Sequence, residues 1–172
     1  MKRTRALAAC WLALAPAFAH ALKTDSEQPI EIEADFAELD EGEGKTIYRG
    51  NVIVVQGSIR MTGDLLRVDL DDQNELQDAY LEGRPAVFKQ RPDDSENDIV
   101  GRALTIEYHS KEKLLYLISE ARVTRGEELF EGHRISYDTE RSIITAHSDD
   151  EVAPKRRVRI VIPPQKKNEP AQ

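Results

Sequence analysis

Apolar and polar residues alternate along most of the chain, most clearly in residues 30–32, 66–70, 104–108 and 158–162. A period of two is typical of strands that bury one face and expose the other. The segments between the alternating runs are rich in Asp, Asn and Gly, which favour turns. The pattern therefore predicts an all-β protein whose strands are joined by short polar connections.

Two patterns recur along the predicted strands. In one, a glycine (Gly63, Gly101 or Gly132) is followed by apolar residues beginning three positions later. In the other, two apolar residues stand two positions apart, at 52 and 54, 86 and 88, and 121 and 123. Recurrence at this spacing predicts a stack of similar β-layers, none of which buries its apolar face alone. A meandering sandwich with coincidental repeats is the alternative.

The two ends of such a stack carry strands with open edges. The first predicted strand, residues 30–34, follows Pro29, and the last, residues 158–162, precedes Pro163. Natural proteins usually protect exposed edges, yet both strands keep strong β-forming residues, and the prolines give each strand a defined stop. We therefore expect them to be docking edges, to which another β-layer adds by strand pairing.

The first 21 residues have the pattern of a cleavable secretory leader. A basic head precedes an apolar run over residues 6–19, and small residues offer cleavage after Ala19 or Ala21. The apolar run is shorter than the roughly 20 residues that span a bilayer. Cleavage would remove Cys10, the only cysteine, so we expect an exported domain that is stabilised without disulfides.

The charge balance argues against nucleic-acid binding. The whole chain has a net charge of −8, and without residues 1–21 it has 21 basic and 32 acidic residues. Six basic residues and one acidic residue lie in residues 154–172, beyond an acidic body. An acidic body with a basic end could attract copies of the chain head to tail; the alternative is a charge run that is only a solvated surface.

Motifs for catalysis or cofactor binding are missing from the sequence. The histidines lack metal-binding spacing, and the segment around Asp69 and Asp71 resembles a calcium loop without its glycine and final glutamate. We therefore expect no catalytic residue, no metal and no cofactor. The apolar interior could be a closed core or, if two sheets splay apart, a groove for an apolar ligand.

Residues 28–35 and 48–57 resemble the OstA-like family of lipopolysaccharide-export proteins, the LptA family. The second stretch reads Tyr-Arg-Gly-Asn-Val-Ile-Val-Val-Gln-Gly. The resemblance continues through residues 83–86, 132–138 and 157–163. It therefore covers essentially the whole chain beyond the leader.

This resemblance implies a stacked antiparallel β-jellyroll, twisted and V-shaped, with an open apolar trough. We expect a leader at residues 1–21, the OstA-like domain at 22–163, and a disordered, polar and basic tail at 164–172.

The resemblance also implies a periplasmic bridge that carries lipopolysaccharide from the inner to the outer membrane. Its partners would be the lipid A acyl chains, further copies joined head to tail, and LptC-like inner-membrane and LptD-like outer-membrane sister domains. A cleavable leader and an end at Gln172 favour the soluble bridge over these sisters. The alternative is a structural adaptor that assembles through its edges and binds no lipid.

The expected site residues are apolar and share the inward register or lie on the terminal strands. The trough residues are Ile30, Ile32, Val52, Val54, Phe88, Leu104, Ile106, Tyr108, Leu117, Ile135 and Tyr137. The partner edges are Ile30, Ile32, Val158, Ile160 and Ile162.

Overall fold

The computed structural model describes residues 25–93, 95–148 and 157–164. The expected leader and nearly all of the expected tail lie outside these residues. A 3-10 turn and ten strands make up the described chain. They are η1 (Asp25–Glu27), β1 (Glu31–Glu33), β2 (Phe36–Asp40), β3 (Lys45–Gln56), β4 (Ile59–Leu70), β5 (Leu76–Gln90), β6 (Ile99–His109), β7 (Leu114–Arg125), β8 (Glu128–Asp138), β9 (Ile143–His147) and β10 (Arg159–Val161).

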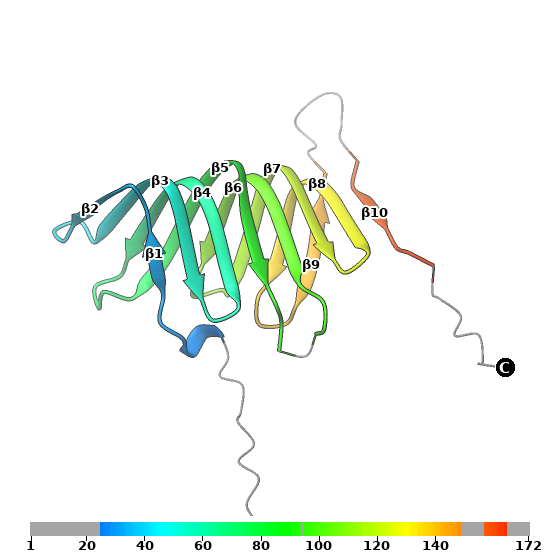
Figure 1. The fold of residues 1–172 in the computed structure, drawn as a ribbon, viewed down its shortest axis with the longest axis horizontal. Coiled ribbons are helices and arrows are strands. Elements are labelled where there is room, and N and C mark those ends of the chain that lie inside the picture. Colours follow the sequence, from blue (N-terminus) through cyan, green and yellow to red (C-terminus); the bar gives the residue numbers. More distant parts are fainter. Residues whose placement is uncertain (1–24, 94, 149–156, 165–172) are drawn as a thin grey trace, which may run out of the picture.

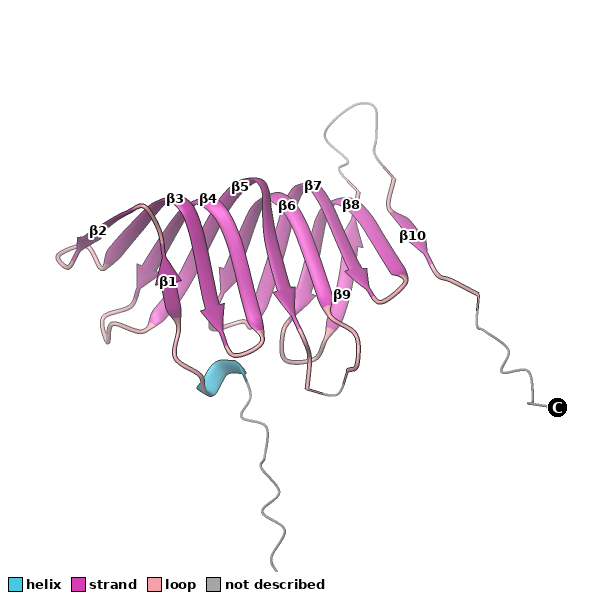
Figure 2. Ribbon diagram, in the orientation of Figure 1, coloured by secondary structure: helices cyan, strands magenta, loops and turns pink. Residues whose placement is uncertain are grey.

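The strands form one antiparallel sheet in the order β1-β3-β4-β5-β6-β7-β8-β10. Two further strands extend it, β2 beside β3 and β9 beside β8. The stack runs along the long axis, with β1 and β2 at one end and β9 and β10 at the other (Figure 1). Figure 2 shows strands almost throughout, so the all-β prediction is confirmed. No helix of the described chain is long and apolar enough to cross a membrane.

Strands β3 to β8 each cross a bend that divides the sheet into two walls. Pairing is interrupted at the same level in every neighbouring pair, for example between Arg49 and Val52 of β3 and between Ile118 and Ala121 of β7. Backbone angles φ of +46° at Asn51 and +57° at Glu120 accompany these irregularities. Extra residues in one strand of a pair bend the sheet, which accounts for the V shape.

We name the two walls by the segments on either side of the bend. The first wall consists of β1, β10 and residues 52–56, 59–63, 86–90, 99–103, 121–125 and 128–132. The second wall consists of β2, β9 and residues 45–49, 65–70, 76–82, 105–109, 114–118 and 134–138.

Directly paired residues form continuous inward rows along both walls. The row of the first wall is Ile32, Val54, Met61, Phe88, Gly101, Val123, Phe130 and Ile160. The row of the second wall nearest the bend is Ala37, Tyr48, Leu66, Leu81, Ile106, Leu117, Ile135 and Ala146. Because apolar side chains face each other across the V, the predicted layer stack has one continuous apolar interior.

Small residues mark the bend and allow the two walls to meet. Gly63 pairs with Val52, Ala86 with Ala103, and Ala121 with Gly132. A Cβ atom on Gly63 would lie 2.7 Å from the carbonyl oxygen of Glu82, closer than real Cβ atoms come. The bend therefore requires a glycine here.

Replacing Gly63 with alanine should lower the free energy of unfolding by about 1–3 kcal/mol, because the backbone must shift to admit the methyl group. Urea denaturation measures the change. Asp64→Ala, at an exposed neighbouring position, is the control and should change stability by less than about 0.5 kcal/mol. Equal midpoints for the two variants would show that the bend tolerates a side chain.

The bend also corrects one prediction about the interior. Leu104 was expected to face inward, three positions after Gly101, but its side chain is 39% exposed. Gly101 pairs with Phe88 and Val123, within the first wall, and Ala103 is the residue at the bend. The inward positions of β6 are therefore Ala103 and Ile106, and Leu104 lies between them on the outside.

Candidate functional site

An apolar cavity of about 350 Å³ opens between the two walls at the β1–β5 end of the stack. Most of its lining side chains are aliphatic or aromatic. It is lined by Ile30, Ile32, Thr46, Tyr48, Val54, Gln56, Ile59, Met61, Leu66, Val68, Leu70, Asn74, Leu76, Ala79, Phe88, Tyr108, Leu115 and Thr139. A concave site of this size with few polar groups suits an apolar ligand.

Toward the β10 end the interior is closed. Ile99, Val123 and Ile135 are at most 1% exposed, and they pack in the same buried cluster as Leu117 and Tyr137. Side chains from the two walls fill the space here as in an ordinary core. The interior is thus open in one half of the stack and sealed in the other.

The predicted trough residues fall into four groups in the structure. Fully buried are Val52, Phe88, Ile106, Leu117, Ile135 and Tyr137. Partly buried and lining the cavity are Ile32, Val54 and Tyr108. Ile30 is 46% exposed at the rim of the cavity, and Leu104 lies outside the interior.

Several cavity residues were absent from the predicted set. They include Tyr48, Ile59, Met61, Val68, Ala79 and Leu115. The alternation already marks Val68, in phase with Leu66 on β4. Met61 and Ile59 have the opposite phase to Leu66, because Gly63 and the bend separate them. Their inward position follows only from the pairing of Met61 with Val54 and Phe88.

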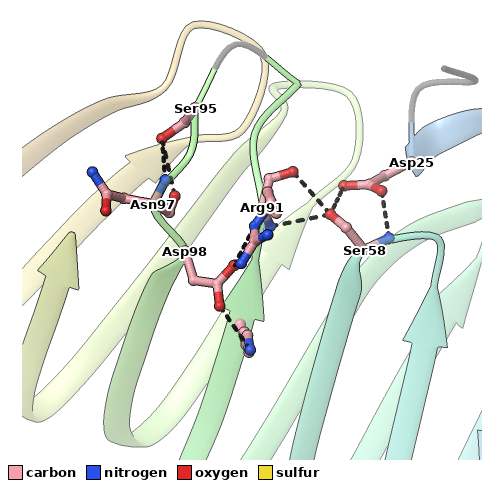
Figure 3. A network of polar contacts seen from close by, with 7 residues as sticks. Asp25, Ser58, Arg91, Ser95, Asn97 and Asp98 are labelled. Atoms are coloured by element: carbon pink, nitrogen blue, oxygen red, sulfur yellow. Dashed lines mark hydrogen bonds and ion pairs between the residues drawn. The ribbon is translucent and has the colours of Figure 1, made fainter. Parts of the chain in front are cut away.

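A polar network fastens the N-terminal segment below the cavity (Figure 3). The carboxylate of Asp25 accepts hydrogen bonds from the backbone N–H of Ser58 at 2.6 Å and from its hydroxyl at 2.8 Å. The backbone N–H of Arg91 donates to the Ser58 hydroxyl at 3.1 Å. The carboxylate of Asp98 lies 2.6 Å from the guanidinium of Arg91 and 2.7 Å from the ammonium of Lys89. This network ties η1, the β3–β4 turn and the β5–β6 loop together.

The carboxylate of Asp98 is the charged centre of that loop. Hydrogen bonds from Lys89 and then Arg91 lower its pKa below the ordinary value. It therefore stays ionised across the neutral range.

The two predicted partner edges are at the ends of the first wall. Ile160 is 51% exposed and Ile162 73% exposed, while Ile32 and Val158 are partly buried. The guanidinium of Arg159 donates to Glu131 of β8 at 3.0 Å, and Arg159 is the leading cause of a lowered pKa at Glu131. Apolar side chains at an unpaired sheet edge are the feature expected of a docking strand.

Two tyrosines of the interior have shifted pKa values. Burial raises the pKa of Tyr108 and of Tyr137, so both hydroxyls stay protonated at neutral pH. Within the described residues, no group of three or more His, Cys, Asp or Glu side chains could hold a metal ion. The arrangement offers an apolar cavity and polar contacts at its mouth.

Comparison with known families decides the identity of this architecture. The model of the family described as LptA/(LptD N-terminal domain) LPS transport protein matches residues 31–143. The chain belongs to this family. The matched residues run from β1 to the start of β9, so they include both walls of the V except for most of β9 and all of β10.

Relatives within the LptA family cover nearly the same length. The chain is 37% identical over 158 residues to the lipopolysaccharide export system protein LptH of Pseudomonas aeruginosa, covering 90% of each chain. It is 31% identical over 153 residues to the lipopolysaccharide export system protein LptA of Escherichia coli K12, covering 87% of this chain and 78% of the relative.

A solved structure supports the fold of this family member. The crystal structure of LptH from Pseudomonas aeruginosa superposes with a TM-score of 0.76 at 36% identity. The match covers 83% of this chain and 100% of that one. LptH is described there as the LptA-homologous periplasmic component of a lipopolysaccharide transport device. The β-jellyroll predicted from the sequence is therefore confirmed.

Proposed function

We propose that this protein carries lipopolysaccharide through the periplasm from the inner to the outer membrane, with the acyl chains held between the two walls. The observation that carries the proposal is the apolar cavity lined by Ile32, Val54 and Tyr108. Membership of the LPS transport family supports it. The cavity residues, with the predicted trough residues that face the interior, form the acyl-chain path.

The physical need for such a path lies in the solvation of acyl chains. Each methylene group exposed to water costs about 0.8 kcal/mol, so a chain of more than ten carbons cannot cross an aqueous compartment unshielded. A binding surface without reactive groups is sufficient for this task. We therefore propose that the protein is a carrier without catalytic activity.

Assembly of several copies would extend the path across the periplasm. Because β1 and β10 run in opposite directions in the sheet, a second copy whose β1 lies beside β10 continues the antiparallel order. If the inward rows continue in register, Ile160 faces Ile32 of the next copy and Arg159 faces its Glu33. The join then buries two apolar side chains and pairs opposite charges.

The second wall can continue across the same join. Leu39 of β2 and Ile144 of β9 are the two ends of a second row of directly paired residues in this wall, farther from the bend than the first row. Leu39 is 58% exposed in the single chain, and Ile144 of the preceding copy would cover it. We propose the same edges as the contact sites for LptC-like and LptD-like sister domains.

Photocrosslinking tests lipid carriage. A photoreactive residue at Phe88 or Tyr108 should become covalently attached to added lipopolysaccharide, because both side chains line the cavity. The same residue at Lys89 or Glu107, in the outward register of the same strands, should not. Equal labelling from both registers, or none from either, would leave the protein as an adaptor that assembles through its edges without lipid.

A further inference from the structure

The open and sealed halves of the interior meet at a direct contact between the walls. Phe88 of the first wall and Tyr137 of the second have ring centroids 5.9 Å apart. Phe88 also lines the cavity, whereas Tyr137 is 1% exposed and belongs to the sealed half. An acyl chain that moves from the cavity toward β10 must pass this contact.

A buried hydrogen bond joins the walls at the same level. The hydroxyl of Tyr137 donates to Oε1 of Gln90 at 3.0 Å. Gln90 is 7% exposed, and Gln90 and Thr46 are the buried polar side chains of the described core. A buried polar side chain in an otherwise apolar interior needs its partners, because leaving it unsatisfied is costly. The Gln90–Tyr137 hydrogen bond therefore favours walls that stay together.

The N-terminal segment holds Gln90 from the opposite side. The side-chain amide of Gln90 donates from Nε2 to Asp25 at 2.9 Å. Asp25 is itself fixed to the β3–β4 turn by Ser58, as described above. A Cβ atom on Gly57 would lie 2.5 Å from the Asp25 carboxylate, so the turn is shaped to receive this segment. A chain of hydrogen bonds thus runs from the mouth of the V, through Gln90, to the second wall.

We propose that Asp25, Gln90 and Tyr137 form a latch between the two walls, and that acyl chains pass from the open to the sealed half only when this latch opens. The inference rests on the proposed lipid carriage. The proposed conformational step is the opening of the Gln90–Tyr137 contact, and the N-terminal segment stabilises the closed state through the bond from Gln90 to Asp25. The Gln90–Tyr137 hydrogen bond joins two neutral groups and contributes little net stability, so it can break and re-form without unfolding the sheet.

A ligand with a large apolar surface lowers the free energy that is needed to open the latch. Parting the walls at Phe88 exposes apolar side chains and breaks the Gln90–Tyr137 hydrogen bond. An acyl chain that enters covers those side chains again, which restores the burial that was lost. The same opening without a ligand leaves that surface in water, so the latch closes behind the lipid.

The test uses residues 22–172, with a benzophenone side chain at Met61 in the open half or at Phe130, which is partly buried beside β10 beyond the sealed core. The probe is purified lipopolysaccharide, and the rate of labelling is followed at each position. Tyr137→Phe removes the hydroxyl and keeps the ring, so folding is preserved. Tyr116→Phe, the same change in the outward register of β7, where Tyr116 pairs with Glu107, is the matched control.

In the unaltered protein, Met61 should be labelled faster than Phe130. Tyr137→Phe should raise the rate at Phe130 relative to Met61 by about three- to tenfold, the effect of one lost hydrogen bond on an opening equilibrium. Asp25→Ala should act in the same direction. Amide hydrogen exchange at the end of β5 should rise in Tyr137→Phe and stay unchanged in Tyr116→Phe, with or without lipid.

The outcomes separate the latch from lipid carriage. Labelling at Met61 with a Phe130-to-Met61 ratio that is the same in all variants would overturn the latch and leave carriage intact. Equal rates at both positions in the unaltered protein would overturn it as well. If Met61 is never labelled, lipid carriage fails and the latch fails with it as a lipid gate.

Discussion

Replacing Val54 with aspartate should give a folded protein that takes up no lipopolysaccharide, whereas Ile106→Asp should abolish folding. Both side chains lie in inward rows of the sheet, and both were expected to contact acyl chains. Val54 is partly buried and lines the cavity, while Ile106 is 0% exposed in the closed core. The position of each residue relative to the cavity decides which result appears.

The expected loss at Ile106 is large because a carboxylate has no partner there. Burying an ionised group in an apolar interior, together with the lost packing of the isoleucine, costs more than about 4 kcal/mol. That is comparable to the whole stability of many domains. At Val54 the carboxylate can reach water through the open cavity, so the cost to folding is small. A charge in the cavity, however, excludes acyl chains.

Circular dichroism and lipid photocrosslinking from a probe at Phe88 measure the two effects. Val55→Asp, on the outward register of the same strand, is the control and should keep both fold and labelling. If Val54→Asp unfolds like Ile106→Asp, the cavity is part of the closed core. If it folds and is still labelled as before, the acyl chains lie elsewhere.

Replacing Ile160 with proline should leave the single chain folded and abolish assembly into longer oligomers. Ile160 is at the centre of β10, the last strand of the first wall, and its side chain is 51% exposed. Proline removes one backbone N–H and disrupts the short strand that would pair with β1 of the next copy. Strands β3 to β8 do not depend on this pairing.

Light scattering at matched concentrations measures the assembly, and the apparent dissociation constant should rise at least about tenfold, the effect of roughly 1.4 kcal/mol. Ile160→Val keeps the strand and its apolar side chain and should assemble as the unaltered chain does. A truncation before Val158 should behave like the proline variant. Long assemblies that persist in both would place the joining edge on β9 or elsewhere.

Much of this architecture follows from the order of residues along the chain. The alternation in residues 66–70 sets Leu66 and Val68 on one face, and the structure places both toward the interior. The terminal strands predicted over residues 30–34 and 158–162 are present as β1 and β10, shortened at both ends. These predictions succeed because period-two burial is a local property of each strand.

The position of the bend in each strand could not be predicted from the local alternation of apolar and polar residues. Leu104 has the right spacing from Gly101 for an inward residue, and Leu66 has the same spacing from Gly63. Pairing shows that Gly101 belongs to the row of Phe88, whereas Gly63 lies at the bend, where Ala103 takes its place in β6. The phase of burial changes where each strand crosses the bend, and the position of the bend is set by pairing with neighbouring strands, which the sequence of one strand does not reveal.

The sequence by itself thus determined the strand content, the repeated layers and the two edge strands, because each depends on residues close together in the chain. Tertiary structure alone decided where the strands bend, that the interior is open beside Val54 and sealed around Ile135, and that Gln90 meets Tyr137 across the walls. Those features depend on how side chains that are far apart in the sequence pack against each other across the two walls. Their outcome depends on the shape of the assembled sheet.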